Sequence, residues 1–252
     1  MNQEERRKYL IARLSDEQIP EDPVEQKNLL RRLVNVRPPS EYDDDLLKIQ
    51  DEYLACEIET SGIIEASSLQ ELQSKIILWQ GDITTLKCDA IVNAANSMMT
   101  GCYIPNHKCI DNCIHTFAGV QLRTECGKLM KELGRPAKTS EAFITKGYNL
   151  PARYVIHTIG PIVFNEVTEK ETTQLAKCYQ NCMSLAAENG CKSLAFCCIS
   201  TGEFRFPNEL AARIATATVK ENLSFHPEIE QVIFNVFLDK DREIYREILE
   251  SS

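Results

Sequence analysis

Two cysteines and a histidine stand close together in the chain, at Cys102, His107 and Cys109. Thiolates and imidazoles are ligands that Zn²⁺ prefers, at about 2.0–2.3 Å, and three protein ligands leave a fourth position open for water or substrate. Pro105 and Asn106 lie between the ligands and favour a tight turn that would bring the three side chains together. The segment therefore predicts a zinc site with a free coordination position.

The spacing of these residues leaves two other interpretations open. The pattern Cys-x4-His-x-Cys is not that of a standard zinc finger, so two ordinary thiols and a surface histidine explain it equally well. Alternatively, Cys113 or His115 could supply a fourth ligand and close the site, which would make the metal structural rather than catalytic.

Polar side chains follow two apolar runs that have the length of buried strands. Asp82 comes directly after Gly81, where a carboxylate can accept a hydrogen bond from an exocyclic amine such as N6 of adenine. A turn or capping role is the simpler interpretation of an isolated Gly-Asp pair. Asn93 and Asn96 end the second run, and their amides suit the hydroxyls of a ribose as well as ordinary turn chemistry.

A third loop has the composition of a phosphate-binding segment. Ser200 to Phe204, with the sequence STGEF, follows an apolar run and precedes a helix that is expected to start near Pro207. Small residues and backbone N–H groups in such a place can surround a phosphate. Phe204 is the candidate for stacking on the same ligand.

These loops need a scaffold of strands and helices to bring them together. From about Lys75, apolar runs of strand length alternate with helical patterns, which predicts an α/β layered sandwich. His157 and the pair Cys197-Cys198 fall within such runs and are expected to be core residues. The expected strands are 76–79, 90–92, 141–145, 154–158, 193–199 and 231–237. Helices are expected from residue 114, over 169–188, near 207 and from 239.

Residues 1–73 differ from the rest of the chain because they are polar and helical in pattern. Apolar residues recur at helical spacing over 10–14, 29–33 and 46–54, and prolines separate these stretches. The apolar stripes are too thin to form a core alone, so the segment is expected to pack on the main domain, 74–252. A structural brace is the favoured role, and a cap beside the active site is the alternative. The acidic run 43–45 is expected to be a solvated face.

Composition narrows the class of protein. The chain has 252 residues, 43% of them hydrophobic and 26% charged, as in ordinary globular proteins. The formal charge of −9 argues against a general nucleic-acid binder. No apolar run approaches the length of a membrane span, and the first ten residues lack a signal-peptide core, so a cytoplasmic protein without membrane partners is expected. Eleven cysteines, an odd number without an export signal, argue against a disulfide framework.

Taken together, these features resemble a macrodomain, the α/β/α module that binds ADP-ribose. The resemblance covers about Lys75 to Ser252 and implies a three-layer α/β/α sandwich with a mixed central sheet, preceded by an N-terminal helical extension. Four motifs occur in the family's order: Gly81-Asp82-Ile83-Thr84, the octapeptide DAIVNAAN that ends at Asn96, Ile114-His115 with Ala118-Gly119, and Ser200-Thr201-Gly202 with Phe204 and Pro207.

One departure from the common macrodomain pattern is informative. Most macrodomains follow the Asn-Ala-Ala-Asn motif with a glycine-rich loop, whereas here the segment 98–112 carries Cys102, His107 and Cys109. This is similar to the zinc-dependent subfamily of microbial protein-ADP-ribose hydrolases, which also has an N-terminal helical extension. The resemblance therefore favours Zn²⁺ as the cofactor. In that subfamily the gene commonly sits beside a class M sirtuin and a lipoylated carrier resembling glycine cleavage protein H, which implies both as functional partners.

The resemblance also implies a role for each motif. Asp82 and Ile83 would hold the adenine, and Asn96 would hold the distal ribose. The remaining contacts to phosphates and ribose would come from Cys109, Ile110, Asp111, Asn112, Ser200, Thr201, Gly202, Glu203 and Phe204.

The implied reaction is hydrolysis of the glycosidic bond that joins mono-ADP-ribose to a protein side chain, with Asn96 and Asp111 orienting the ribose or the water. A reader that binds ADP-ribose without turnover is the main alternative. A zinc nucleoside deaminase also uses one histidine and two cysteines, but it requires His-x-Glu followed by Pro-Cys-x-x-Cys. His226-Pro227-Glu228 matches the first element, and the second is absent from the sequence.

Overall fold

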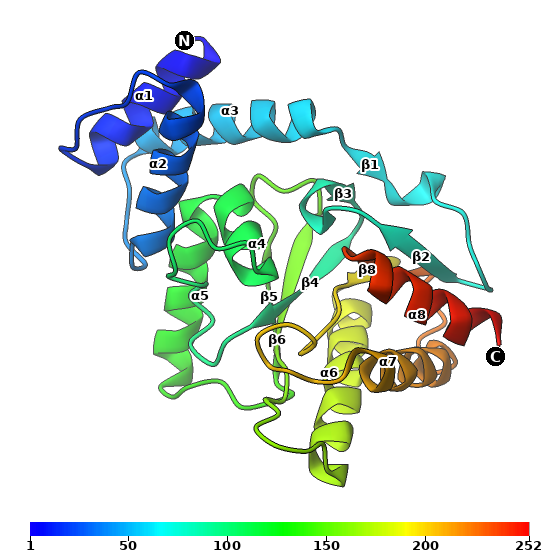
Figure 1. The fold of residues 1–252 in the computed structure, drawn as a ribbon. Helices are drawn as coiled ribbons and strands as arrows, with labels where there is room; N and C mark the ends of the chain where they lie inside the picture. The colour runs from blue at the N-terminus through cyan, green and yellow to red at the C-terminus, as the bar shows by residue number, and fades with distance from the viewer. Residues whose placement is uncertain (252) are drawn as a thin grey trace.

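The computed structural model of the protein describes residues 1–251, and its centre is a six-stranded mixed sheet (Figure 1). The strand order is β2-β8-β7-β4-β6-β5, with every neighbouring pair parallel except β5 and β6. The strands are β2 (Ile76–Gln80), β4 (Ala90–Ala95), β5 (Ala142–Lys146), β6 (Tyr154–Ile159), β7 (Ser193–Phe196) and β8 (Gln231–Val236). Because five strands are parallel, their carboxyl ends lie at one edge of the sheet.

The strands form because their apolar runs can be buried on both faces of a parallel sheet. Ala90, Ile91 and Val92 in β4 are fully buried between β6 and β7. The prediction of strand 193–199 was too long, since β7 ends at Phe196. The chain turns out of the sheet there toward Ser200, whose backbone φ is 66°. Cys197 is nevertheless buried, in agreement with the prediction of a core residue.

Helices cover both faces of this sheet, which confirms the predicted three-layer α/β/α sandwich. One layer contains α6 (Glu169–Glu188), α7 (Asn208–Leu223) and α8 (Asp239–Glu250), which contact one another in that order. The other contains α4 (Ile110–Ala118) and α5 (Val120–Leu133), which contact β4 and β5 respectively. α6 has the bounds predicted from the sequence, and a capping box between Thr168 and Glu171 fixes its start. α4 begins four residues before the predicted Ile114, with Cys109 as its N-cap.

The N-terminal extension forms a small core of its own, contrary to the expectation that its stripes were too thin. Its helices are α1 (Gln3–Leu14), α2 (Pro23–Val36) and α3 (Asp44–Ser61). Their N-cap side chains are those of Asn2, Asp22 and Asp43, respectively. Three thin stripes become sufficient because α1 packs against both α2 and α3. The cluster consists of Leu10, Ile11, Leu14, Leu29, Leu30, Leu33, Leu46, Tyr53 and Leu54.

The extension also packs on the main domain, as predicted. α2 and α3 contact α4 (Figure 1), and Gln50 on α3 accepts a hydrogen bond of 3.0 Å from the N–H of Val120. A cavity of about 200 Å³ lies among the helices of the extension, and Thr116 and Phe117 of α4 line part of it. The extension is not helical throughout, because β1 (Ile64–Glu65) pairs in parallel with β3 (Leu86–Lys87) and is followed by the 3₁₀ turn η1 (Ala66–Ser68). No helix among residues 1–251 has the length and apolarity that crossing a membrane requires.

Candidate active site

The loops predicted to bind a ligand meet at the carboxyl edge of the parallel strands. β2 leads into Asp82, β4 leads into Asn96, and β7 leads into the loop that starts near Ser200. β4 lies next to β7, and β2 lies next to β8. Open α/β sheets bind ligands in the crevice outside such strand ends.

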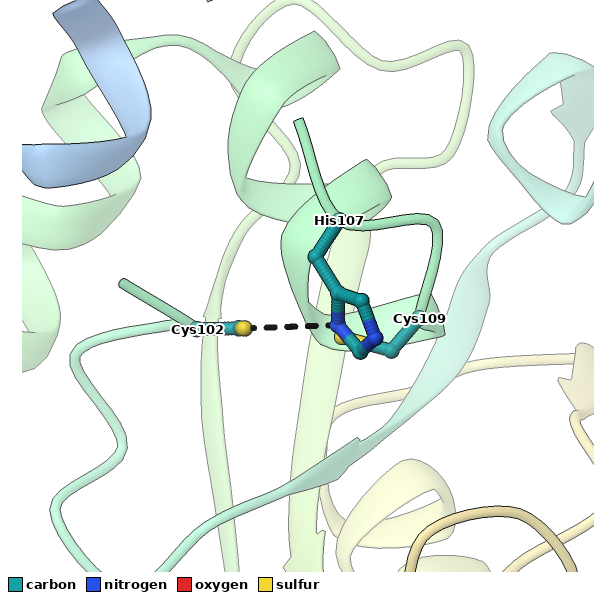
Figure 2. Close-up of side chains that lie close together, drawn as sticks. All are labelled: Cys102, His107 and Cys109. Carbon is teal, nitrogen blue, oxygen red and sulfur yellow. Dashed lines mark hydrogen bonds between the residues drawn. The ribbon is translucent and has the colours of Figure 1, made fainter. Parts of the chain in front are cut away.

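The three predicted metal ligands converge in the segment Gly101–Cys109, which we call the metal loop. The ligand atoms of Cys102, His107 and Cys109 all lie within 4.8 Å of one another, and Figure 2 shows the two thiols beside the imidazole ring. The Cys102 Sγ atom lies 3.6 Å from His107 Nδ1. Tetrahedral zinc bonds of about 2.3 Å to sulfur and 2.0–2.1 Å to nitrogen would separate such a pair by roughly 3.6 Å. The three residues therefore fit a zinc ion without rearrangement of this pair.

The two alternative fourth ligands lie elsewhere. Cys113 Sγ faces Arg31, at 3.4 Å from its Nη2 atom. His115 is buried in a second cluster with Cys126 and His157. The metal loop thus offers three protein ligands, and neither Cys113 nor His115 belongs to its cluster among the described residues.

The Cys109 thiol keeps its proton at neutral pH unless a cation stabilises the thiolate. Burial raises the pKa of the Cys109 thiol to about 12, although the N–H of Asn112 donates to its Sγ atom at 3.5 Å and opposes the rise. The thiol group of Cys102 beside it raises the pKa further. Two adjacent thiolates need a positive charge to be stable at neutral pH, and a divalent metal supplies one.

Asp111 is the buried carboxylate next to the metal loop. Its Oδ1 accepts a hydrogen bond of 2.8 Å from the Asn93 amide, and its Oδ2 accepts one of 3.2 Å from Asn96. Burial raises the pKa of Asp111 to about 6, and the hydrogen bond from Asn93 opposes this shift. Asn96 also donates to the carbonyl of Gly101 at 3.2 Å, so it connects the end of β4, the carboxylate and the metal loop.

A histidine pair lies beneath this carboxylate, in the interior of the domain. His157 is fully buried, as predicted for a core histidine, and its ring nitrogens lie 3.1 Å from Asn93 Nδ2 and 2.9 Å from Thr145 Oγ1. Burial lowers the pKa of His157 to about 3. The pKa of His115 is lowered for the same reason, and its Nε2 atom lies 3.6 Å from Asp111 Oδ1. Both rings are therefore neutral at physiological pH.

Asp82 serves as a cap and keeps one oxygen available. It is the N-cap of the 3₁₀ turn η2 (Ile83–Thr85), and its Oδ1 atom accepts hydrogen bonds from the N–H and hydroxyl of Thr84 at 2.9 and 2.7 Å. The capping interpretation is thus confirmed, and it leaves Oδ2 for a ligand. Ile83 is buried in the main core, so only its backbone can reach a ligand at this edge.

The loop after β7 presents backbone donors. Ser200 is buried, whereas Gly202 and Glu203 are exposed and Thr201 and Phe204 are half-buried. Within residues 1–251 the N–H groups of Gly202, Glu203 and Phe204 donate no hydrogen bond to the protein. Unpaired N–H groups close together form an anion-binding concavity. Glu203 extends toward the metal loop, with its Oε1 atom 3.7 Å from His107 Nε2.

The start of α4 offers a second group of backbone donors. Cys109 is the N-cap, and Ile110 and Asp111 form the first turn, whose N–H groups and helix dipole favour an anion. Asn112, which is predicted to line the ligand site, turns its side chain inward. Its side chain is fully buried, and its Nδ2 atom donates to the carbonyls of Cys102 and Ile104 at 3.3 and 3.1 Å. The amide of Asn112 therefore points into the metal loop.

Two aromatic residues at the same edge escaped sequence analysis. Phe237 follows β8 and is 72% exposed, and its carbonyl accepts a hydrogen bond of 3.1 Å from Gln80, two residues before Asp82. Phe164 follows β6 and is 81% exposed. Large aromatic side chains exposed beside strand ends mark ligand-binding surfaces. Phe237 was the last residue of the predicted strand 231–237, and Phe164 lies six residues after the predicted strand 154–158, so the sequence singled out neither of them.

Comparisons with known proteins agree with this geometry. The sequence matches the Macro domain family over residues 92–215. A protein-ADP-ribose hydrolase from Treponema medium is 51% identical, over 99% of this chain and 100% of the relative. A protein-ADP-ribose hydrolase from Staphylococcus aureus (strain MSSA476) is 47% identical, over 87% of this chain and 83% of the relative.

Solved structures show the same fold. The Trypanosoma brucei macrodomain in complex with ADP-ribose matches with a TM-score of 0.67 and 28% identity, over 90% of this chain and 96% of that one. An Oceanobacillus iheyensis macrodomain mutant with ADPR matches with a TM-score of 0.66 and 32% identity, over 73% of this chain and 96% of that one. The chain belongs to the Macro domain family and, within it, to the protein-ADP-ribose hydrolases.

Proposed function

We propose that this protein is a zinc-dependent hydrolase that removes mono-ADP-ribose from a modified protein side chain. The observation that carries the proposal is the contact between two groups at one edge of the sheet. Asn96 bonds both to the buried carboxylate of Asp111 and to the carbonyl of Gly101, which begins the metal loop. A carboxylate and a metal-ligand cluster are thus held together beside two loops that can bind a diphosphate.

The ligands of the zinc ion would be Cys102, His107 and Cys109. When bound, zinc supplies a Lewis acid that polarises a ribose hydroxyl or the scissile group, or lowers the pKa of a water toward about 7. Two thiolates and a neutral imidazole leave such a site formally uncharged. Its acidity is then lower than with three neutral ligands, so substrate positioning must contribute to the rate.

The protein's own groups divide the remaining work. Asp82 would accept a hydrogen bond from the adenine, and the N–H groups of residues 202–204 and of the first turn of α4 would bind the diphosphate. Asn96 and Asp111 would orient the distal ribose and the attacking water. In the reaction, water forms a bond to the anomeric carbon, and the bond to the side-chain heteroatom breaks. That heteroatom leaves with the electron pair and takes up a proton, and free ADP-ribose is the other product.

The decisive experiment uses a mono-ADP-ribosylated protein as the substrate and measures released ADP-ribose. The wild-type chain should release it, and a zinc chelator should stop the release until zinc is restored. A chain that binds ADP-ribose with micromolar or better affinity but releases nothing, with or without added zinc, would instead be a reader. Release that continues at the same rate in chelator would refute the zinc dependence while leaving the hydrolase in place.

The acceptor to test first is a lipoylated carrier protein resembling glycine cleavage protein H, modified by a class M sirtuin. This choice rests on the family resemblance of the metal loop. The panel of substrates should also include proteins modified on carboxylate and on serine side chains, because the rates on these substrates identify the bond that is cleaved.

A further inference from the structure

We propose that α2 of the N-terminal extension holds the metal loop in its ligating shape, with Arg31 and Asn35 as positioning residues for the zinc site. This inference rests on the proposed zinc site and assigns the extension a specific task. Both residues lie on one side of α2, one helical turn apart, and both reach across to the metal loop and α4. Directed polar contacts join α2 to the metal loop beside the cavity that Arg31 lines.

Arg31 binds three groups around the metal loop through one nitrogen. Its Nη2 atom donates to the carbonyl of His107 at 2.9 Å, to Asn112 Oδ1 at 3.0 Å and toward Cys113 Sγ at 3.4 Å. Hydrogen bonds from a charged donor are stronger than neutral ones. The bond to the His107 carbonyl fixes the backbone of the histidine ligand itself.

Asn35 fixes the turn just before that ligand. Its Oδ1 atom accepts a hydrogen bond of 3.0 Å from the N–H of Asn106, and its Nδ2 atom donates to Thr116 Oγ1 at 3.0 Å. Asn106 has a backbone φ of 56°, a left-handed conformation that costs free energy for a residue with a side chain. Asn35 is fully buried and satisfied on both sides, so it holds this turn against Thr116 in the last turn of α4.

Asn112 connects Arg31 to both cysteine ligands through hydrogen bonds. Its Oδ1 atom accepts from Arg31, and its Nδ2 atom donates to the carbonyl of Cys102 at 3.3 Å. Its backbone N–H donates to Cys109 Sγ at 3.5 Å. Each of the three metal ligands is therefore held, directly or through one residue, by a group that α2 fixes.

Arg123 on α5 anchors α2 to this place. Its Nη1 atom donates to the carbonyls of Val34, Asn35 and Arg37 at 3.1, 2.7 and 2.6 Å. These groups lie at the carboxyl end of α2, where the Val34 carbonyl also accepts from the N–H of Arg37 at 3.4 Å. The same guanidinium lies 4.6 Å from the ring centroid of Tyr103, inside the metal loop. The buried Arg123 thus couples the position of α2 to that of the loop from the opposite side.

The physical consequence concerns metal affinity. A loop held in its ligating shape loses little conformational freedom when the ion binds, whereas a free loop must be ordered first. Removal of a hydrogen-bond partner that orients metal ligands typically lowers metal affinity 10- to 100-fold. We expect Arg31→Ala and Asn35→Ala each to fall in this range.

The test measures zinc affinity by competition with a chromogenic chelator, in the purified full-length chain. The matched control is Arg32→Ala, since Arg32 neighbours Arg31 on the same helix and pairs with Glu17 at the surface instead. Arg32→Ala should bind zinc as tightly as the wild type, and Arg31→Ala should bind it at least 10-fold more weakly. Arg31→Lys keeps the charge and three donors and should recover most of the loss. Circular dichroism and a melting curve should show that each variant folds. If Arg31→Ala does not fold, the zinc affinity of Asn35→Ser provides the test instead.

The outcomes separate this inference from the proposed function. Wild-type protein that binds no zinc would refute the zinc site itself. Wild-type protein that binds zinc, together with folded Arg31→Ala and Asn35→Ala variants of unchanged zinc affinity, would leave the proposed function intact and overturn the role of α2. An Arg31→Lys variant as weak as Arg31→Ala would refute the hydrogen bonds of Nη2 as the cause.

Discussion

The assignment of the adenine contact to Asp82 can be tested with a substitution that the structure specifies. Asp82→Ala changes two things at once, because the carboxylate also caps η2 through two hydrogen bonds from Thr84 to Oδ1. Asp82→Asn separates the two roles. Asparagine is as good a cap as aspartate, so its oxygen can keep both bonds to Thr84. Its NH₂ group then replaces Oδ2, the oxygen left for the adenine amine, by a donor.

The magnitude follows from the single bond that is lost. A hydrogen bond to a charged group contributes about 1.5–3 kcal/mol, which corresponds to a loss of affinity of about 10- to 150-fold. Asp82→Asn should therefore weaken ADP-ribose binding by this factor and leave the melting temperature close to that of the wild type. Asp82→Ala should show the same loss of affinity together with about 1 kcal/mol of lost stability from the missing cap.

Isothermal titration calorimetry with ADP-ribose measures the affinity, and binding of ribose 5-phosphate, which lacks the adenine, provides the control. Its weak binding should be the same in both proteins. If Asp82→Asn binds ADP-ribose as tightly as the wild type does, the adenine lies elsewhere and Asp82 is a turn residue only. If only Asp82→Ala loses affinity, the cap rather than the carboxylate charge is what the site requires.

Four further predictions follow from the same structure. His107→Ala should lose zinc and most of its turnover, measured as released ADP-ribose, but should still bind ADP-ribose measurably. The reason is that removal of a group that acts in the transition state lowers kcat more than ground-state affinity. A folded, zinc-free variant with the wild-type rate would contradict this. Asp111→Asn should lower kcat by about 10²-fold, since asparagine can accept from only one of the two amide donors and the geometry shifts; unchanged initial rates would remove Asp111 from the mechanism. Phe237→Ala should weaken ADP-ribose binding by about 1–3 kcal/mol in calorimetry if the ring stacks on the adenine, with no change in melting temperature. The pKa of His157 is about 3 in the folded protein, whereas this histidine takes up a proton below about pH 6.5 in the unfolded chain, so the free energy of unfolding should fall as the pH drops. Between pH 8 and pH 5 the loss from this histidine is about 2 kcal/mol. Urea unfolding in chelator should therefore show, for His157→Gln, a pH dependence that is smaller by that amount.

The sequence by itself determined the layers of the fold and which strand ends carry the candidate site residues. Parallel strands buried on both faces must be continuous apolar runs, and the helices between them carry local start signals, as at Thr168 and Glu171. The three candidate metal ligands could be grouped in advance because they lie within one short loop, where spacing alone limits their separation. The capping role of Asp82 was readable for the same reason, since its partner Thr84 is two residues away.

Only the tertiary structure decided what depends on contacts between distant segments. The bond from Arg31 to His107 joins residues 76 positions apart, and nothing in the pattern of α2 distinguishes Arg31 from Arg32. The extension forms its own core because the apolar stripes of α2 and α3, each too thin alone, both pack against α1. Asn112, predicted to contact a ligand, turns inward because two carbonyls and an arginine from elsewhere satisfy its amide. Local sequence fixes which groups are available, whereas burial and partner choice depend on the folded arrangement of the whole chain.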